Sequence, residues 1–269
     1  MKRFALVGKD IKNSFSPAIH SYCFNVLGID AKYEIIDIDS STKIVDVITL
    51  LKMGELDGIN ITSPYKQSFL QYIDELNLRA ESIGSINCIH NYKNKLIGNN
   101  TDWFGFAKSV DNFKGYKNVI IIGTGGATLP LIYYFKSKQN LSIHIVGRDT
   151  KKLQGLCTDN VHLHNLANTS LDLPRCFIIN AIPSHANINW NNMYQKFHPR
   201  PLYAFDLNYH LEVTNFLNYY SSQTKIKNGL EMLIYQALMS IDIWFKKELS
   251  SAINVEDLKV HINKKYLNG

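Results

Sequence analysis

The stretch that decides the fold is Asn118-Val119-Ile120-Ile121-Ile122-Gly123-Thr124-Gly125-Gly126-Ala127, in which an apolar run leads directly into a glycine cluster. The apolar run predicts a buried strand, and the cluster predicts a tight turn into a helix over 128–138. In such a turn Gly123 permits the bend, Gly125 lets the backbone approach a pyrophosphate, and the helix N-terminus supplies N–H groups. We therefore expect a dinucleotide to be bound by Gly123, Thr124, Gly125, Gly126 and Ala127. Thr128 replaces the third glycine of the usual motif, and an ordinary glycine-rich turn is the alternative.

Gly147-Arg148-Asp149 follows a second predicted strand at 141–146, where the residue that reads the adenosine ribose belongs. The Arg148 guanidinium suits the 2′-phosphate of NADP, with lysines close behind it. Asp149 favours NAD instead, because a carboxylate repels that phosphate and accepts a hydrogen bond from a 2′-hydroxyl. We expect NADP, bound at this end by Gly147, Arg148, Asp149 and Lys152, and NAD stays open as the alternative.

Composition limits the class of protein. The chain has 269 residues, of which 45% are hydrophobic and 19% charged, as in a soluble globular protein. The net charge of +6 comes from scattered lysines without a basic block, so we expect no nucleic-acid partner. We expect no membrane partner, since no segment is long and apolar enough, and the first apolar run is too short for a signal peptide. The four scattered cysteines predict reduced thiols and a cytoplasmic location.

Predicted strands and helices alternate along the first hundred residues, which indicates an α/β fold with a parallel sheet. Helices are expected after Ser16-Pro17 and over 42–53, and a long amphipathic helix over 230–246. The strands are expected at 3–7, 32–38, 58–61, 86–92, 95–98, 176–179 and 203–205. We therefore expect two domains. Residues 1–102 and 230–269 would form a substrate-binding catalytic domain to which the C-terminal helix returns, and residues 103–229 a Rossmann-like domain for NADP.

Three polar clusters follow predicted strands, where ligands of open parallel sheets bind. They are Asn13-Ser14-Phe15-Ser16, Asn60-Ile61-Thr62-Ser63-Pro64-Tyr65-Lys66 and Asn99-Asn100-Thr101-Asp102. Each has a plain structural interpretation, with Ser16 and Asp102 as helix N-caps and Lys66 as a solvent-facing lysine. Together they predict a pocket with hydroxyl and amide donors, one amine and one carboxylate. Such a pocket suits a polyhydroxylated carboxylic acid that undergoes hydride transfer.

At these residues the chain resembles the shikimate dehydrogenase family, nearly from end to end. The matching segments are Ser14-x-Ser16-Pro17 with His20, Asn60-x-Thr62-x-Pro64-x-Lys66, Gly84-x-x-Asn87, Asn100-Thr101-Asp102, Gly123-x-Gly125-Gly126-Ala127, Asn180-Ala181, Asp206-x-x-Tyr209 and Gly229-Leu230-x-Met232-Leu233-x-x-Gln236. Many motifs in the right order are far more specific than any one of them. The chain departs from the family at Gly147-Arg148-Asp149, where Asn-Arg-Thr is usual, and at Trp103, where glycine is usual. It also departs at Ile182-Pro183, where small polar residues are common, and at 210–213, which lack a proline-containing loop.

The resemblance implies reversible NADPH-dependent reduction of 3-dehydroshikimate to shikimate, a step of aromatic amino acid (chorismate) biosynthesis. It implies Lys66 as the acid/base and Asp102 as the carboxylate that holds it. The substrate-binding residues would be Ser14, Ser16, Asn60, Thr62, Asn87, Tyr209 and Gln236. The resemblance adds to the cofactor site Asn180, Ala181, Leu207, Gly229 and Met232. It also implies two hinged domains that close over the reactants, and it leaves a homodimer open.

Three alternatives remain. A quinate/shikimate dehydrogenase that uses NAD is the nearest, and Asp149 favours it. A non-catalytic dinucleotide sensor of the same fold is the second, although it would not need both Lys66 and Asp102. A metal enzyme is the third. His162-x-His164 would place two imidazoles on one face of a strand, but with no third ligand evident nearby we expect a surface loop there and no metal.

Overall fold

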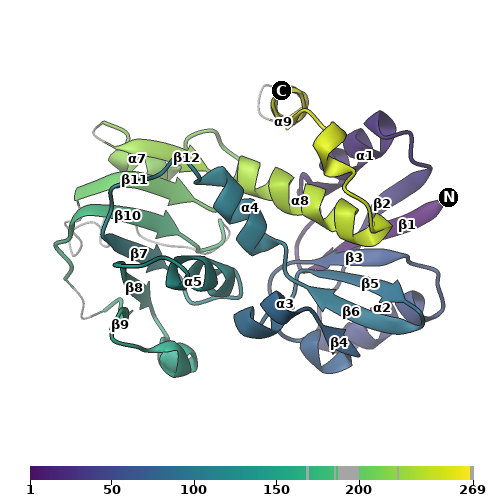
Figure 1. Ribbon diagram of the computed structural model, residues 1–269, viewed down its shortest axis with the longest axis horizontal. Helices are drawn as coiled ribbons and strands as arrows, with labels where there is room; N and C mark the ends of the chain where they lie inside the picture. The colour runs from purple at the N-terminus through teal and green to yellow at the C-terminus, as the bar shows by residue number, and fades with distance from the viewer. Residues whose placement is uncertain (168–169, 185, 187–199, 223, 267–269) are drawn as a thin grey trace. The chain divides into compact units, whose positions relative to one another are not determined.

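The computed structural model describes residues 1–167, 170–184, 186, 200–222 and 224–266, and the chain forms two compact units (Figure 1). The first unit combines Met1–Ser109 with Glu231–Gly269, and the second is Val110–Leu230. The first boundary thus falls after Ser109 rather than at Asp102, because helix α4 (Asp102–Ser109) belongs to the first unit. Gly105 explains this placement. A Cβ there would lie 3.0 Å from the Gln236 backbone in α8 (Leu230–Phe245), so the two helices touch backbone to backbone.

The first unit contains a six-stranded sheet in the order β2-β1-β3-β5-β6-β4. Strand β1 pairs in parallel with β2 and β3, whereas β5 is antiparallel to both β3 and β6. The predicted parallel start and the predicted hairpin are therefore confirmed, and the sheet as a whole is mixed. The strands are β1 (Lys2–Gly8), β2 (Ala31–Asp37), β3 (Gly58–Ile61), β4 (Glu75–Leu76), β5 (Cys88–Tyr92) and β6 (Lys95–Asn99).

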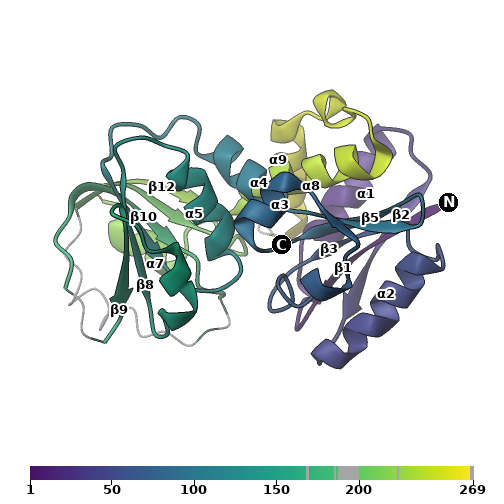
Figure 2. The same ribbon diagram turned by 60° about the horizontal axis from the view of Figure 1, so that its bottom comes forward.

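Helices cover both faces of this sheet, α2 (Ile44–Lys52) on one side and α1 (Ser16–Val26) with α8 on the other (Figure 2). The alternation of side chains along β1 explains the two layers. Ala5 and Val7 belong to the apolar cluster that includes residues of α2. Phe4 points the other way and stacks on Trp244 of α8, with ring centroids 4.4 Å apart. The short helix α3 (Leu78–Ile83) and the terminal helix α9 (Val255–Tyr266) complete the unit.

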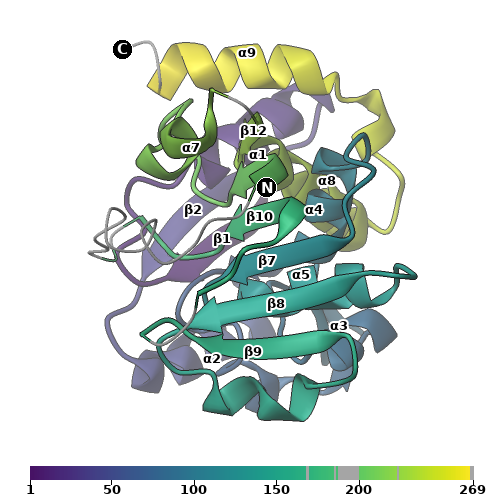
Figure 3. The same cartoon turned by 90° about the vertical axis from the view of Figure 1, so that its left-hand side faces the viewer.

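The second unit contains a six-stranded sheet in the order β12-β11-β10-β7-β8-β9, in which every strand pair is parallel (Figure 3). All its strands therefore end at one edge, which we call the carboxyl edge. The apolar run of β7 is buried on both faces, as expected for a parallel sheet covered by helices. The elements are β7 (Asn118–Ile122), α5 (Thr128–Lys136), β8 (Ser142–Gly147), β9 (Val161–Asn165), β10 (Pro174–Asn180), β11 (Arg200–Asp206), α7 (Asn215–Tyr220) and β12 (Lys225–Asn228).

One sequence-based expectation about this sheet is wrong. His162 and His164 lie on β9, not in a surface loop, because residues 161–165 pair in parallel with β8. Their imidazoles pack on His144 of β8, and His144 Nδ1 lies 3.0 Å from His164 Nε2. Across the described ranges, no three His, Cys, Asp or Glu side chains are arranged as metal ligands.

Membrane spans are a separate question for the helices of this fold. None in the described part of the chain is both long enough and apolar enough to cross a bilayer.

Candidate active site

The centre of the candidate site is the pair formed by Lys66 and Asp102 in the first unit. Lys66 Nζ lies 2.6 Å from Asp102 Oδ2, and the two side chains are only 13% and 8% exposed. Lys66 follows β3, and its carbonyl accepts a hydrogen bond from the Ile86 N–H at 3.0 Å. The plain interpretation of Lys66 as a solvent-facing lysine is therefore wrong. An ammonium and a carboxylate stand within hydrogen-bonding distance, as proton transfer requires.

Asp102 is the first residue of α4 and does not cap it. The backbone N–H of Asp102 donates to Asn100 Oδ1 at 3.1 Å, so the asparagine fixes the start of the helix. The Asn100 amide in turn donates to the Ser85 carbonyl at 2.9 Å. This arrangement leaves both carboxylate oxygens of Asp102 for side-chain partners. At the next residue of the helix, the Arg79 guanidinium lies 4.7 Å from the centroid of the Trp103 ring.

Asn87 joins Asp102 to the rest of the site. Its Nδ2 group donates to Asp102 Oδ1 at 2.9 Å, and its Oδ1 accepts from the Thr101 N–H at 2.6 Å. Gln236 Oε1 of α8 lies 3.3 Å from both Asn87 Nδ2 and Thr101 Oγ1. Because Lys66 holds one carboxylate oxygen and Asn87 the other, the Asp102 side chain is fixed in orientation. Thr101 belongs to a recognised motif, yet sequence reasoning assigned it no role.

Asn60 lies behind this cluster. Its side chain is 3% exposed, its Oδ1 accepts from the Tyr33 hydroxyl at 2.9 Å, and its Nδ2 donates to Ser240 Oγ at 2.8 Å and to the Asn87 carbonyl at 3.1 Å. These bonds commit the amide to protein partners. They tie Asn60 to the Asn87 backbone, and the direct substrate contact that the sequence predicts for Asn60 stays a prediction.

The hydroxyls of Ser14 and Ser16 lie 3.2 Å apart beyond the end of β1. Ser16 is the first residue of α1 and does not cap it, and its N–H donates to Ser14 Oγ at 3.3 Å. Thr62 follows the neighbouring strand β3, and its N–H donates to the Val7 carbonyl at 2.9 Å. Three hydroxyl groups thus follow two adjacent parallel strands. His20 supports them from the core, where its Nδ1 lies 2.9 Å from the Ser16 carbonyl and burial lowers its pKa to about 4.

In the second unit the glycine turn lies at the carboxyl edge. Gly123 has a φ of +127°, and a Cβ there would lie 3.0 Å from the Ala181 carbonyl oxygen, so the position requires glycine. A Cβ at Gly125 would meet nothing within 4 Å, which leaves open space beside the turn. Thr128 takes the place of the third glycine and still packs against the turn, because its buried hydroxyl donates to the Gly123 carbonyl at 3.0 Å.

The residues expected at the ribose end follow β8. Gly147 must lack a side chain, because the Thr124 methyl group fills the place of its Cβ. Arg148 is exposed, and its carbonyl accepts from Asn165 Nδ2 at 3.3 Å. Asp149 is also exposed, and one of its carboxylate oxygens accepts from the Lys151 N–H at 3.1 Å. Asp149 therefore has a local role in the turn, where Lys152 also lies. This role weakens the case for NAD that rests on its carboxylate.

The ends of β10 and β11 supply the remaining residues expected at the cofactor. The Asn180 side chain is 1% exposed and bonds to protein groups, with Nδ2 donating to Asp206 Oδ1 at 2.9 Å. The Leu207 N–H donates to the Asn180 carbonyl at 2.9 Å. Gly229 packs against the Leu207 carbonyl, which leaves no room for a Cβ. Tyr209 belongs to the second unit, whereas Met232 and Gln236 belong to the first.

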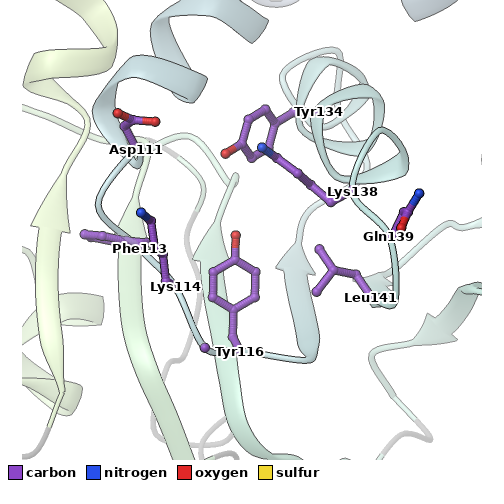
Figure 4. Close-up of a pocket in the computed structure, with 9 residues that line it drawn as sticks. Asp111, Phe113, Lys114, Tyr116, Tyr134, Lys138, Gln139 and Leu141 are labelled. Atoms are coloured by element: carbon purple, nitrogen blue, oxygen red, sulfur yellow. The ribbon is translucent and has the colours of Figure 1, made fainter.

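A hollow of about 320 Å³ in the second unit lies elsewhere (Figure 4). It is lined by residues that precede β7, among them Phe113 and Tyr116, and by residues in and after α5, among them Tyr134 and Lys138. This is the end of the sheet opposite to the carboxyl edge. The hollow contains none of the predicted site residues.

Two α/β units, one with a buried lysine–aspartate pair and one with a glycine turn at the carboxyl edge of a parallel sheet, define a two-domain oxidoreductase of the Rossmann-containing class. Comparison with known proteins gives the family. The family described as "Shikimate dehydrogenase substrate binding domain" matches residues 6–89. A shikimate dehydrogenase (NADP(+)) from Caldicellulosiruptor saccharolyticus is 30% identical, over 96% of this chain and 98% of the relative. The chain belongs to the shikimate dehydrogenase family.

Two solved structures are similar to this chain in fold over nearly its whole length. Shikimate dehydrogenase 1 from Peptoclostridium difficile has a TM-score of 0.83 and 29% identity, covering 100% of this chain and 99% of that one. A shikimate dehydrogenase solved in complex with NADP+ also has a TM-score of 0.83, with 28% identity, covering 99% of this chain and 96% of that one. The predicted fold class is therefore confirmed.

Proposed function

We propose that this chain catalyses the reversible NADPH-dependent reduction of 3-dehydroshikimate to shikimate, a step of aromatic amino acid (chorismate) biosynthesis. The observation that carries the proposal is the contact of 2.6 Å between Lys66 Nζ and Asp102 Oδ2. Full-length relatives that are named NADP-dependent shikimate dehydrogenases support the same function. The non-catalytic sensor is disfavoured, because a protein that only binds a dinucleotide has no use for a buried ammonium held by a carboxylate.

In the proposed mechanism Lys66 carries the proton. Its ammonium donates a proton to the substrate oxygen when the carbonyl is reduced to a hydroxyl, and the amine takes the proton back in the reverse reaction. The positive charge also stabilises the negative charge that develops on that oxygen. Asp102 holds the amine through Oδ2 while Asn87 holds Oδ1, so the proton is released from a fixed place.

The residues present fit NADP. The open space beside Gly125 is what a pyrophosphate needs to reach the backbone, and α5 begins directly after the turn. Arg148 would hold the 2′-phosphate with its exposed guanidinium. When bound, NADPH supplies the hydride that reaches the carbonyl carbon of the substrate. We propose that Ala181, Leu207, Gly229 and Met232 line the nicotinamide side, with Asn180 acting through the backbone that it holds.

We propose that Ser14, Ser16 and Thr62 bind the carboxylate and hydroxyls of the substrate. Their hydroxyl groups follow adjacent strands, and a site that hydrogen-bonds a hydroxyl discriminates strongly against analogues that lack it. Tyr209 and Gln236 are proposed to complete the site. The Gln236 amide now donates to the Leu233 carbonyl at 2.8 Å, so it would turn toward the substrate upon binding.

The test of the proposed function is an absorbance assay for reduced nicotinamide on the purified chain. Shikimate and quinate are each offered with NADP+ and with NAD+. We expect the highest kcat/KM for shikimate with NADP+. Equal or better turnover of quinate with NAD+ would replace this function with the alternative. Tight cofactor binding without turnover of either acid would favour the non-catalytic sensor.

Two further proposals concern the cellular location and the oligomeric state of the enzyme. We propose a cytoplasmic location, which the reduced and buried thiols of Cys23, Cys88 and Cys176 support. Burial raises the pKa of the Cys23 and Cys88 thiols to about 12, so neither reacts as a thiolate at neutral pH. A homodimer stays a prediction, and light scattering on the purified protein checks it.

A further inference from the structure

Asp206, the last residue of β11, is a buried carboxylate that the mechanism above does not use. It is 1% exposed, and it accepts four hydrogen bonds. On Oδ1 the donors are Asn180 Nδ2 at 2.9 Å, the Asn208 N–H at 3.0 Å and Asn208 Nδ2 at 2.8 Å. On Oδ2 the donor is the Thr214 hydroxyl at 2.6 Å. All four donors are neutral groups, so the carboxylate is stabilised by directed hydrogen bonds rather than by a paired cation.

These donors come from three separate segments of the second unit. Asn180 ends the neighbouring strand β10, Asn208 begins the loop after β11, and Thr214 ends that loop. Thr214 is also the N-cap of α7, where its Oγ1 accepts from the Leu217 N–H at 3.3 Å. One carboxylate therefore fixes both ends of the loop 207–214. The Asn228 amide holds the middle of the loop by donating to the Leu211 carbonyl at 3.1 Å.

The hydrogen bonds continue from Asp206 to the glycine turn. Asn180, which Asp206 orients, accepts from the Ile182 N–H at 3.0 Å through its own Oδ1. Asn208 Nδ2 donates to the Ile182 carbonyl at 3.0 Å. Residues 180–182 are thus held from both sides, and the Ala181 carbonyl stands 3.0 Å from the place of a Gly123 Cβ. A displacement of residues 180–182 would therefore move the Ala181 carbonyl against the backbone at Gly123.

We propose that Asp206 is a positioning residue for the cofactor, because its carboxylate sets the loops after β10 and β11 against the glycine turn. The proposal rests on the proposed function for the identity of the ligand, NADP(H). Burying a carboxylate is costly, and an asparagine of the same shape would avoid that cost. An asparagine would, however, replace one of the two oxygens with an NH2 group. Its hydrogens would then face groups that now donate to that oxygen. Only an ionised oxygen pair accepts from all four groups at once.

The experiment measures the Kd of NADPH by fluorescence titration without substrate, together with the melting temperature of each variant. The variants are Asp206→Asn, Thr214→Val and the conservative Thr214→Ser. We expect Asp206→Asn and Thr214→Val to raise the Kd about tenfold or more, since each leaves buried polar groups unpaired. Thr214→Ser keeps the hydroxyl and should stay within about twofold. All titrations are made well below the lowest melting temperature.

Asp242→Asn is the matched control for a purely structural effect. Asp242 in the first unit clamps a loop in the same way, accepting from the N–H groups of Leu249 and Ser250 at 2.7 and 2.8 Å. We expect this variant to lower the melting temperature while the Kd of NADPH stays at the wild-type value. The proposal is overturned if folded Thr214→Val binds NADPH as wild type does, if Thr214→Ser loses as much as Thr214→Val, or if Asp242→Asn raises the Kd equally.

The titration also separates this proposal from the proposed function. Wild-type protein that binds NADPH but does not oxidise shikimate would contradict the function and leave the role of Asp206 open to the same comparison of Kd values. Wild-type turnover together with an unchanged Kd in Asp206→Asn would contradict the role of Asp206 alone. Wild-type protein that does not bind NADPH would overturn both.

Discussion

The Lys66–Asp102 cluster of the first unit is held together by side chains, whereas the glycine turn of the second unit depends on its backbone. In the cluster, side chains hold side chains, with Asp102 gripped by Lys66 on one oxygen and Asn87 on the other. In the turn, backbone meets backbone, and the requirement at Gly123 is the absence of a side chain. The difference teaches that substitutions in the cluster should change kcat, whereas those in the turn should change cofactor affinity.

Lys66→Ala should have the largest effect, and it tests the cluster half of this comparison. We expect kcat to fall by about 10²–10⁴-fold, because the proton donor is lost, while the Kd of NADPH stays within a few-fold. Steady-state kinetics and fluorescence titration measure the two quantities. Lys95→Ala is the matched control, since that lysine pairs with Glu75 at the surface and is 58% exposed. Wild-type-like turnover in folded Lys66→Ala protein would remove this lysine from the mechanism.

The core of the first unit should be sensitive to acid at His20. Burial lowers the pKa of His20 to about 4 from its ordinary value of 6.5, so the unfolded chain takes up a proton before the folded chain does. The contribution of His20 to the free energy of unfolding is therefore present above pH 6.5 and is lost as the pH falls toward 4. Between pH 7 and pH 5 this group should cost about 2 kcal/mol in the free energy of unfolding.

His20→Phe provides the comparison for that measurement. The ring of His20 stacks on Tyr33 at 3.8 Å, and a phenyl ring keeps that contact without a titrating nitrogen. Urea unfolding at both pH values should therefore show a smaller loss in the variant than in the wild type. Identical losses in the two proteins would exclude His20 as the source.

Gly125→Ala tests the other half of the comparison, the dependence of cofactor affinity on the glycine turn. Because a Cβ at Gly125 meets no protein atom within 4 Å, we expect the melting temperature to be unchanged. The methyl group would instead stand where the pyrophosphate approaches, so the Kd of NADPH should rise about tenfold. Gly155→Ala, also without a neighbour within 4 Å, should change neither quantity. A cofactor affinity unaffected by Gly125→Ala would place the pyrophosphate elsewhere.

Arg148→Ala should have the smallest effect. Its guanidinium is exposed, so we expect a rise of a few-fold in the KM for NADP+ and a smaller rise in the KM for NAD+. Asp149→Asn serves as the partner variant, because an asparagine can still accept from the Lys151 N–H while it removes the negative charge. Equal changes in both KM values for Arg148→Ala would count against a 2′-phosphate contact.

The fold was predictable wherever the hydrophobic pattern was strong. The isoleucines of β7 and the glycines after them define strand and turn locally, and both are confirmed. β12 was missed because its sequence, Lys225-Ile226-Lys227-Asn228, is charged and short. The predicted start of β5 at residue 86 was early, because the Ile86 N–H bonds to the Lys66 carbonyl and leaves the sheet.

Within the candidate site, sequence reasoning found the groups and missed their supports. The Lys66–Asp102 contact could be predicted because both residues belong to motifs. Asn60 shares such a motif, but the orientation of its amide depends on Ser240, 180 residues further along the chain. Asp206 likewise gains its role from Asn180 and Thr214 on other segments. Partners so distant in sequence leave no local spacing to read.

The discontinuous first unit has a consequence for biosynthesis on the ribosome. Gln236 and Ser240, which contact Thr101 and Asn60, are translated only after all 121 residues of the segment Val110–Leu230. Domains generally fold as their sequence emerges, so the second unit can form while the first still lacks α8 and α9. A nascent chain that stalls before α8 therefore carries Lys66 and Asp102 without the contacts from Gln236 and Ser240, and competence for catalysis arrives only once α8 has been made.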